Sequence, residues 1–126
     1  MNSFDCHRTL QLGSAAYRFH SLEAAEKAGA GRLAELPRSL KVLAENLLRH
    51  EDGHSVSADD IRCLGTWVDS AGAATADTEL SFHPNRVIMP DASGIPLLAD
   101  LCAMRDAMHH FGGDPTRINP LIPVDF

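Results

Sequence analysis

Residues 86–108 read RVIMPDASGIPLLADLCAMRDAM, and this stretch decides the fold class. Arg86–Met89 is a short strand candidate, and the Pro- and Gly-containing run 90–94 predicts a loop after it. Pro96 suits the first turn of a helix that extends to about His110, because proline there loses no hydrogen bond. A strand followed by a loop and a helix indicates an α/β protein. The apolar face of this helix is expected to comprise Leu97, Leu98, Leu101, Met104 and Met108.

Downstream of this helix the chain is apolar and punctuated by proline. Gly112, Gly113 and Pro115 end the helix, and the segment LIPVDF at 121–126 is typical of the start of another strand. Such a strand needs neighbours. We therefore expect the 126-residue chain by itself to expose apolar surface, and to be marginally stable or prone to associate.

Upstream, the sequence predicts mostly helices. Residues 1–20 are irregular, with short extended segments possible at 9–12 and 17–19. Helices are predicted over 22–28, after the N-cap Ser21, and over 38–49, where leucines recur at helical spacing.

Ser57 and Asp60 resemble a capping box that opens a helix over 58–68. The small polar run 69–78 marks a connection, and 80–82 is a further strand candidate. We therefore divide the single segment 1–126 into a mainly helical lead, 1–78, and a first strand–loop–helix unit, 79–126.

Composition excludes several functional classes. The formal net charge is −6 and the sequence pI is about 5.5, which argues against a nonspecific polyanion binder. There is no signal-peptide pattern, and no apolar run approaches the ~20 residues of a membrane span. Cys6, Cys63 and Cys102 form no C-x-x-C pair, and this odd count favours a reducing cytoplasm.

The best site candidate on physical grounds is the start of the last helix. Ligands of α/β proteins collect where strands end and helices begin, and free N–H groups there suit carboxylates. Ser93 and Gly94 would present donors at this point, although the sequence favours Ser93 as an ordinary turn or cap residue. The adjacent His109 and His110 make a poor metal pair, and the chain contains none of the common catalytic motifs. From residue spacing alone the function is not identified.

Long phrases of the chain resemble one enzyme family. They are LPRSLKVLAENLLRHEDG at 36–53, the stretch 86–108 already quoted, and GGDPTRINPLIPVDF at 112–126. The opening RTL and the phrase SLEAAEKAG at 21–29 are similar too. From about Arg8 to Phe126, almost without gaps, the chain resembles the N-terminal segment of the aconitase family, in the branch of bacterial aconitase A and the iron-regulatory proteins. The implied fold is the N-terminal part of the three-layer α/β/α architecture of that family, helix-rich with a few short strands.

The resemblance also implies a chemistry. The family removes and re-adds water on hydroxy-polycarboxylates such as citrate and aconitate, and uses a [4Fe–4S] cluster whose open iron acts as a Lewis acid. Three cysteines hold the cluster, while an Asp-His pair and a serine move protons. In the family, those residues lie downstream of the part that this chain resembles. The resemblance also implies that Cys6, Cys63 and Cys102 do not occupy the positions of the cluster ligands. No catalytic or metal residue is therefore assigned here, and the segment alone is predicted to be inactive.

One substrate-contacting position of the family falls at Pro90, where the family pattern has glutamine. Proline has no side-chain donor or acceptor, so this contact cannot be made. Asp91, Ser93 and Gly94 would still shape the wall of the pocket. Two interpretations stay open: the complete enzyme acts on an analogue of aconitate, or the loop is repurposed or degenerate. The intact phrase around Pro90 favours the first.

Three functional hypotheses follow from these observations. The first is the leading segment of a cytoplasmic hydro-lyase or isomerase, with the remaining aconitase domains in cis or on a separate chain, and with a polycarboxylate as substrate. The second is a stand-alone, non-enzymatic subunit or regulator that docks on an aconitase-like partner. The third, RNA binding by analogy with the iron-regulatory branch, is disfavoured by the negative charge and the missing domains.

Overall fold

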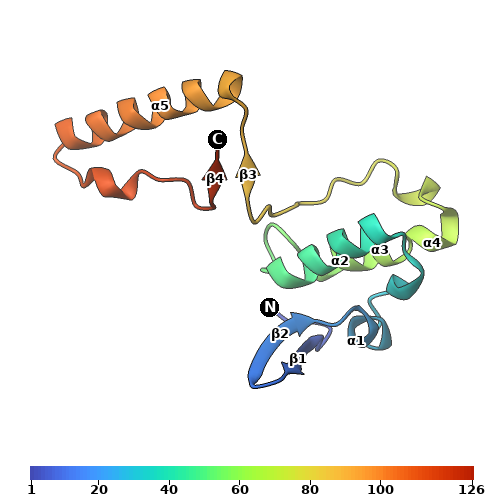
Figure 1. Cartoon of the computed structure of the whole chain (residues 1–126). Helices are drawn as coiled ribbons and strands as arrows, with labels where there is room; N and C mark the ends of the chain where they lie inside the picture. Colours follow the sequence, from blue (N-terminus) through green and yellow to red (C-terminus); the bar gives the residue numbers. More distant parts are fainter. The chain divides into compact units, whose positions relative to one another are not determined.

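The computed structural model describes residues 1–126 apart from the side chain of Ala74. The chain divides into two compact units, Met1–His83 (unit 1) and Pro84–Phe126 (unit 2). Helices dominate both units and the strands are short, as the sequence predicted (Figure 1). The structure places its division at His83, whereas the sequence-based division lies after residue 78.

Unit 1 opens with a β-hairpin. Strands β1, His7–Leu12, and β2, Ala15–His20, pair antiparallel with His7 opposite His20. The two-residue turn between them is Gly13-Ser14, and Gly13 has φ of +61°, a value that favours glycine. The extended segments expected at 9–12 and 17–19 are confirmed, because each lies within one of these strands, but the hairpin that joins them was not predicted. The missed signal is the Gly-Ser dipeptide between two runs of equal length.

Helices build the rest of unit 1. The predicted N-cap Ser21 accepts a hydrogen bond from the Ala24 N–H at 3.1 Å, and the predicted capping box of Ser57 and Asp60 is also present. The helical elements are α1 (Leu22–Lys27), η1 (Leu33–Glu35), α2 (Arg38–His50), α3 (Ala58–Gly65), α4 (Trp67–Ser70) and η2 (Ala73–Thr75).

The third predicted helix, over 58–68, is interrupted in the structure. Helix α3 ends at Gly65, and α4 begins at Trp67 after the shared cap Thr66. Gly65 packs directly on backbone: a β-carbon there would overlap the carbonyl group of Ala30. The carbonyl oxygen of Gly65 accepts a hydrogen bond from Arg32 N–H at 3.1 Å, so the end of α3 is held against the loop after α1.

The core of unit 1 lies between these helices and the chain's first residues. Its largest fully buried side chains include Phe4, Leu33, Leu47, Leu48 and Ile61. The leucine face predicted for α2 is confirmed in this core, with Leu40 and Leu43 partly buried at its edge. Burying such apolar side chains supplies most of the stability of a small unit.

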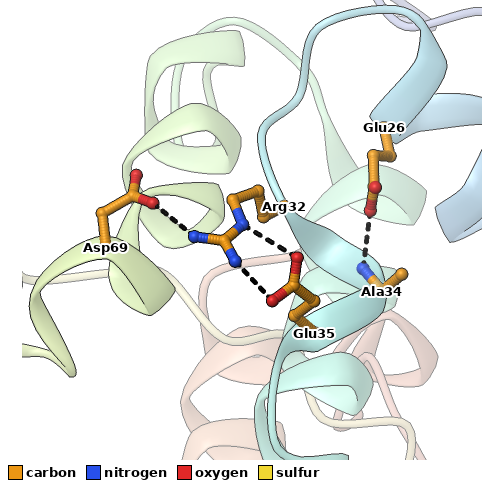
Figure 2. A network of polar contacts seen from close by, with 5 residues as sticks. All are labelled: Glu26, Arg32, Ala34, Glu35 and Asp69. Atoms are coloured by element: carbon orange, nitrogen blue, oxygen red, sulfur yellow. Dashed lines mark hydrogen bonds and ion pairs between the residues drawn. The ribbon is translucent and has the colours of Figure 1, made fainter.

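A polar network fixes the loop between α1 and α2 (Figure 2). Arg32 donates to Glu35 through two guanidinium nitrogens, and its Nη1 reaches Asp69 Oδ1 on α4 at 2.9 Å. Glu26 on α1 accepts from the Ala34 N–H at 2.7 Å. Because these side chains are exposed, their ion pairs contribute little to the free energy of folding. Their main effect is to orient α4 and η1.

The strand predicted at 80–82 is not formed. Instead, the buried amide of Asn46 on α2 binds the chain at His83 through both of its ends. Asn46 Nδ2 donates to the His83 carbonyl at 2.8 Å, and Asn46 Oδ1 accepts from the His83 N–H at 3.0 Å. The Asn46 side chain thus makes the two hydrogen bonds to the His83 backbone that a neighbouring strand would otherwise make.

Unit 2 contains one parallel strand pair and one long helix. Strand β3, Val87–Ile88, pairs in parallel with β4, Val124–Asp125, and α5, Asp91–His110, connects them by way of the 3₁₀ turn η3, Pro115–Arg117. The loop predicted at 90–94 is wrong, because α5 already begins at Asp91. Pro96 consequently lies inside the helix and not in its first turn.

Unit 2 buries very little. Of its described residues only Gly94 is buried, and the predicted apolar face of α5 is half-covered at Leu97, Leu101 and Met108 and exposed at Leu98 and Met104. Ile88, Phe111 and Leu121 are 77%, 82% and 102% exposed. Across the described residues of both units, no helix is both long and apolar enough to cross a membrane.

Candidate functional site

The candidate site is the junction between β3 and α5. Pro90 is the N-cap residue of α5, in an extended conformation with φ −70° and ψ 164°. Its carbonyl accepts the N–H groups of Ser93 at 3.0 Å and Gly94 at 2.8 Å. The first amides of a helix have no partner within the helix, so those of Asp91 and Ala92 are the donors left at this end.

The parallel pairing of β3 and β4 brings two chain segments to this junction. The Met89 N–H donates to the Asp125 carbonyl at 2.9 Å, so Pro90 and Phe126 follow neighbouring strands at the same edge. Arg86 and Asp125 form an ion pair beside it. This edge is where α/β proteins generally bind ligands.

The predicted site residues differ in exposure. Pro90, Asp91 and Ser93 are exposed, whereas Gly94 is buried under the aromatic ring of Phe126. A β-carbon on Gly94 would overlap that ring, so the glycine leaves room for the Phe126 side chain. The four residues are therefore gathered at one helix start, where two amides and the Ser93 hydroxyl can donate to an oxygen. The carboxylate of Asp91 opposes an anion at the same place, and Pro90 offers only its ring.

The described residues offer no site for an iron–sulfur cluster or other metal. Within them no group of three or more histidines, cysteines, aspartates or glutamates is arranged to hold an ion. Cys6 is buried in unit 1, where its Sγ lies 3.4 Å from Asn2 Oδ1, and burial raises the pKa of its thiol. Cys63 Sγ lies 3.6 Å from Thr78 Oγ1, and Cys102 is exposed on α5. We derive no reaction step through a cluster on this chain.

The histidines are arranged in a way that the spacing did not reveal. His50 and His83 stack with ring centroids 4.5 Å apart and planes 13° apart, and His7 meets His20 edge-on at 4.6 Å. The stacking of His50 on His83 accompanies the Asn46–His83 bonds, which no local pattern encodes. The contact of His7 with His20 depends on the hairpin pairing, whose local signal is the Gly13-Ser14 turn. His109 and His110, in contrast, end α5 as neighbours in the last turn.

Comparison with known proteins gives a consistent relationship. No protein-family profile matches the chain. Aconitate hydratase A of Bradyrhizobium diazoefficiens is 46% identical over 99% of this chain, which spans 14% of that protein. Aconitate hydratase A of Streptomyces viridochromogenes is 49% identical over 98% of the chain, and that of Escherichia coli is 47% identical over 93%. The chain spans only 12% and 13% of these two relatives' lengths.

Proposed function

Because the chain is homologous over nearly its whole length to an N-terminal segment of the aconitase family, we propose that it is the leading part of an aconitase-type hydro-lyase. The complete enzyme would remove and re-add water on a hydroxy-polycarboxylate, citrate, aconitate or an analogue. The observation that carries this proposal is the 46% identity over 99% of the chain, matched to only 14% of the relative. The present segment would be catalytically silent by itself.

The incomplete packing of unit 2 supports the proposal that this segment is part of a larger folded protein. Parallel sheets are normally covered on both faces, because their strands are largely apolar. Here the sheet has two strands of two residues each, and only Gly94 is buried among the described residues of the unit. Further strands and helices, in cis or from a separate chain, would complete it as part of the three-layer α/β/α architecture.

The β3–α5 junction would form part of the substrate pocket. A substrate carboxylate would accept hydrogen bonds from the amides of Asp91 and Ala92 and from the Ser93 hydroxyl. Gly94, which has no side chain, would form part of the pocket wall. Pro90 cannot replace the hydrogen bonds of the family glutamine. We favour a complete enzyme whose substrate is an analogue that does not need the glutamine contact. The other interpretation is that the loop at Pro90 is repurposed or degenerate. A [4Fe–4S] cluster, with its Lewis-acid chemistry, would be held by the rest of the enzyme.

A non-enzymatic subunit is the second candidate. Unit 1 has its own core and its own helix caps, whereas unit 2 exposes apolar side chains such as Ile88 and Leu121. A chain with this asymmetry could fold around unit 1 and dock through unit 2 on an aconitase-like partner. It would then add no activity of its own.

The first test is the mass of the native gene product, detected in source cells with an antibody to this segment. A product several times heavier than 13.6 kDa is expected for the leading part of an enzyme. A product of 13.6 kDa would contradict this proposal, and the next step would be to identify the partner chain that it binds.

The second test addresses Pro90 in the complete enzyme. If an analogue is the substrate, Pro90→Gln should improve the kcat/KM for citrate and aconitate, because the amide restores the contact. Pro84→Gln, at an exposed proline outside the junction, is the matched control. Equal effects of the two substitutions would argue that the junction does not contact substrate.

A further inference from the structure

We propose that unit 1 carries a binding site for a small, multiply charged oxyanion, formed by Arg18 and His20 of β2 together with Arg49 of α2. This site is separate from the β3–α5 junction and does not depend on the proposed hydro-lyase function. The residues line a pocket of about 220 Å³ between the hairpin and α2, together with His7 and Phe19. All of them belong to unit 1.

The hairpin register gathers the basic side chains on one face. Arg18 and His20 lie two residues apart on β2, so both point to the same side of the hairpin. His7 is the register partner of His20, and the two rings meet edge-on at 4.6 Å. Arg49, in the last turn of α2, lines the same pocket.

The pocket contains polar groups that have no hydrogen-bond or ion-pair partner among the described residues. His20 Nδ1 is buried and has no hydrogen-bond partner among the described residues; the nearest acid atom, Glu45 Oε1, is 3.8 Å away. A buried polar atom without a partner is destabilising, and a ligand oxygen would accept a hydrogen bond from His20 Nδ1 when that nitrogen is protonated. No ion pair of Arg18 is found within the described part of the chain. Its guanidinium can therefore bind two oxygens of one ligand.

The charges around the pocket favour an anion. The hairpin contributes Arg18, His7 and His20, and α2 contributes Arg49, His50 and one acid, Glu45, which pairs with Arg49. With neutral imidazoles, two guanidiniums and one carboxylate leave the pocket positive in a chain of net charge −6. Arg8, also on β1, is directed to the carbonyls of Asp5 and His7 and is not counted.

Binding should be linked to protonation of His20. In the free protein burial lowers the pKa of His20, and His7 and Arg49 lower it further. An oxyanion beside Nδ1 would favour the charged imidazolium, so binding should strengthen as the pH falls. A phosphate group and a polycarboxylate share this chemistry, since both offer several anionic oxygens to a guanidinium fork.

The test is calorimetric titration of the 126-residue chain at low ionic strength with inorganic phosphate, and separately with citrate. We expect saturable binding with one site per chain for at least one of them; phosphate alone would assign the phosphate class, and citrate alone the polycarboxylate class. Arg18→Gln should weaken binding about tenfold, as expected for the loss of one charge-assisted contact. Arg117→Gln, which removes the same charge from an exposed site in unit 2, should not.

A second arm uses sulfate, whose charge is constant between pH 5.5 and 7.5. Sulfate should bind more tightly at the lower pH, and His20→Phe should reduce this dependence while circular dichroism shows an intact fold. The proposal is overturned if neither phosphate nor citrate gives saturable binding. It is also overturned if Arg18→Gln and Arg117→Gln weaken binding equally, because binding would then reflect general charge only.

Discussion

Gly65 and Ala30 touch backbone to backbone, with no space for a side chain between them. A β-carbon on Gly65 would lie 2.9 Å from both the Ala30 carbonyl carbon and the Gly31 α-carbon, and would overlap the Ala30 carbonyl oxygen. The same contact carries the hydrogen bond from Arg32 N–H to the Gly65 carbonyl. The end of α3 and the loop after α1 are therefore held in one arrangement.

This contact predicts that Gly65→Ala destabilises unit 1. Backbone atoms cannot move aside as a flexible side chain can, so we expect a loss of about 2–3 kcal/mol in the free energy of unfolding, measured in urea. Gly13→Ala is the control. It has open space around it and only a positive φ to oppose the substitution, which should cost about 1 kcal/mol. Equal losses would show that the Gly65 contact carries no extra cost.

Asn46 provides the second prediction. Replacing it by alanine leaves the N–H and carbonyl of His83 without their partners, and we expect a loss of about 2 kcal/mol. Amide hydrogen exchange at residues 80–83 should accelerate as well. Asn85→Ala, at an exposed asparagine two residues beyond His83, should change stability by less than about 0.5 kcal/mol. Unchanged exchange at 80–83 in Asn46→Ala would contradict the role assigned to this amide.

The stacked histidines predict a pH dependence of stability. His50 Nε2 is buried without a partner among the described residues, and burial lowers the pKa of His50, with His83 and Arg49 adding to the effect. The unfolded state, with a histidine pKa of about 6.5, then binds more protons than the folded state. Stability should thus be complete above about pH 7 and should fall as the pH drops through 6.5.

Urea unfolding at pH 7.5, 6.5 and 5.5 measures this dependence. His50→Phe keeps a flat ring against His83 but cannot be protonated, so its stability should vary less over this range. His54→Phe, in an exposed loop, should keep the slope of the unchanged chain. Part of the slope should survive in His50→Phe, because the pKa of His20 is lowered too. A His50→Phe curve as steep as that of the parent would remove His50 from the explanation.

Local signals predicted the helical part of the fold well. Ser21, the Ser57–Asp60 box and the leucine spacing of α2 act within a few residues, and each is present in the structure. Two of the errors occur where distant contacts decide. Asn46 satisfies the segment before His83 from another element, and Gly65 ends α3 because it meets Ala30. Neither partner is visible from sequence neighbours.

The candidate site shows the same division. The phrase around Pro90 indicated the junction between a strand and a helix, but a loop was predicted over 90–94, whereas the helix already starts at Asp91. The sequence predicts Pro96 in the first turn, whereas the structure has it inside α5. The helix tolerates it there because the hydrogen bond that is lost, to the Ala92 carbonyl, lies near the helix start. The basic pocket was not predicted, because it depends on the hairpin register that joins His7 to His20.

The exposed apolar side chains of unit 2 give the last prediction. Ile88 lies on β3 with 77% of its surface exposed, at a strand pair whose outer edges are unpaired in the described residues. Such an edge associates with other chains, and a lysine on it opposes this pairing. The 126-residue chain should self-associate in sedimentation velocity at micromolar concentration, and Ile88→Lys should shift it towards monomer. Val42→Lys, 65% exposed on α2 of unit 1, should leave the association unchanged. If Val42→Lys dissociated the chain as effectively, association would involve unit 1, and the unpaired edge of unit 2 would not be its cause.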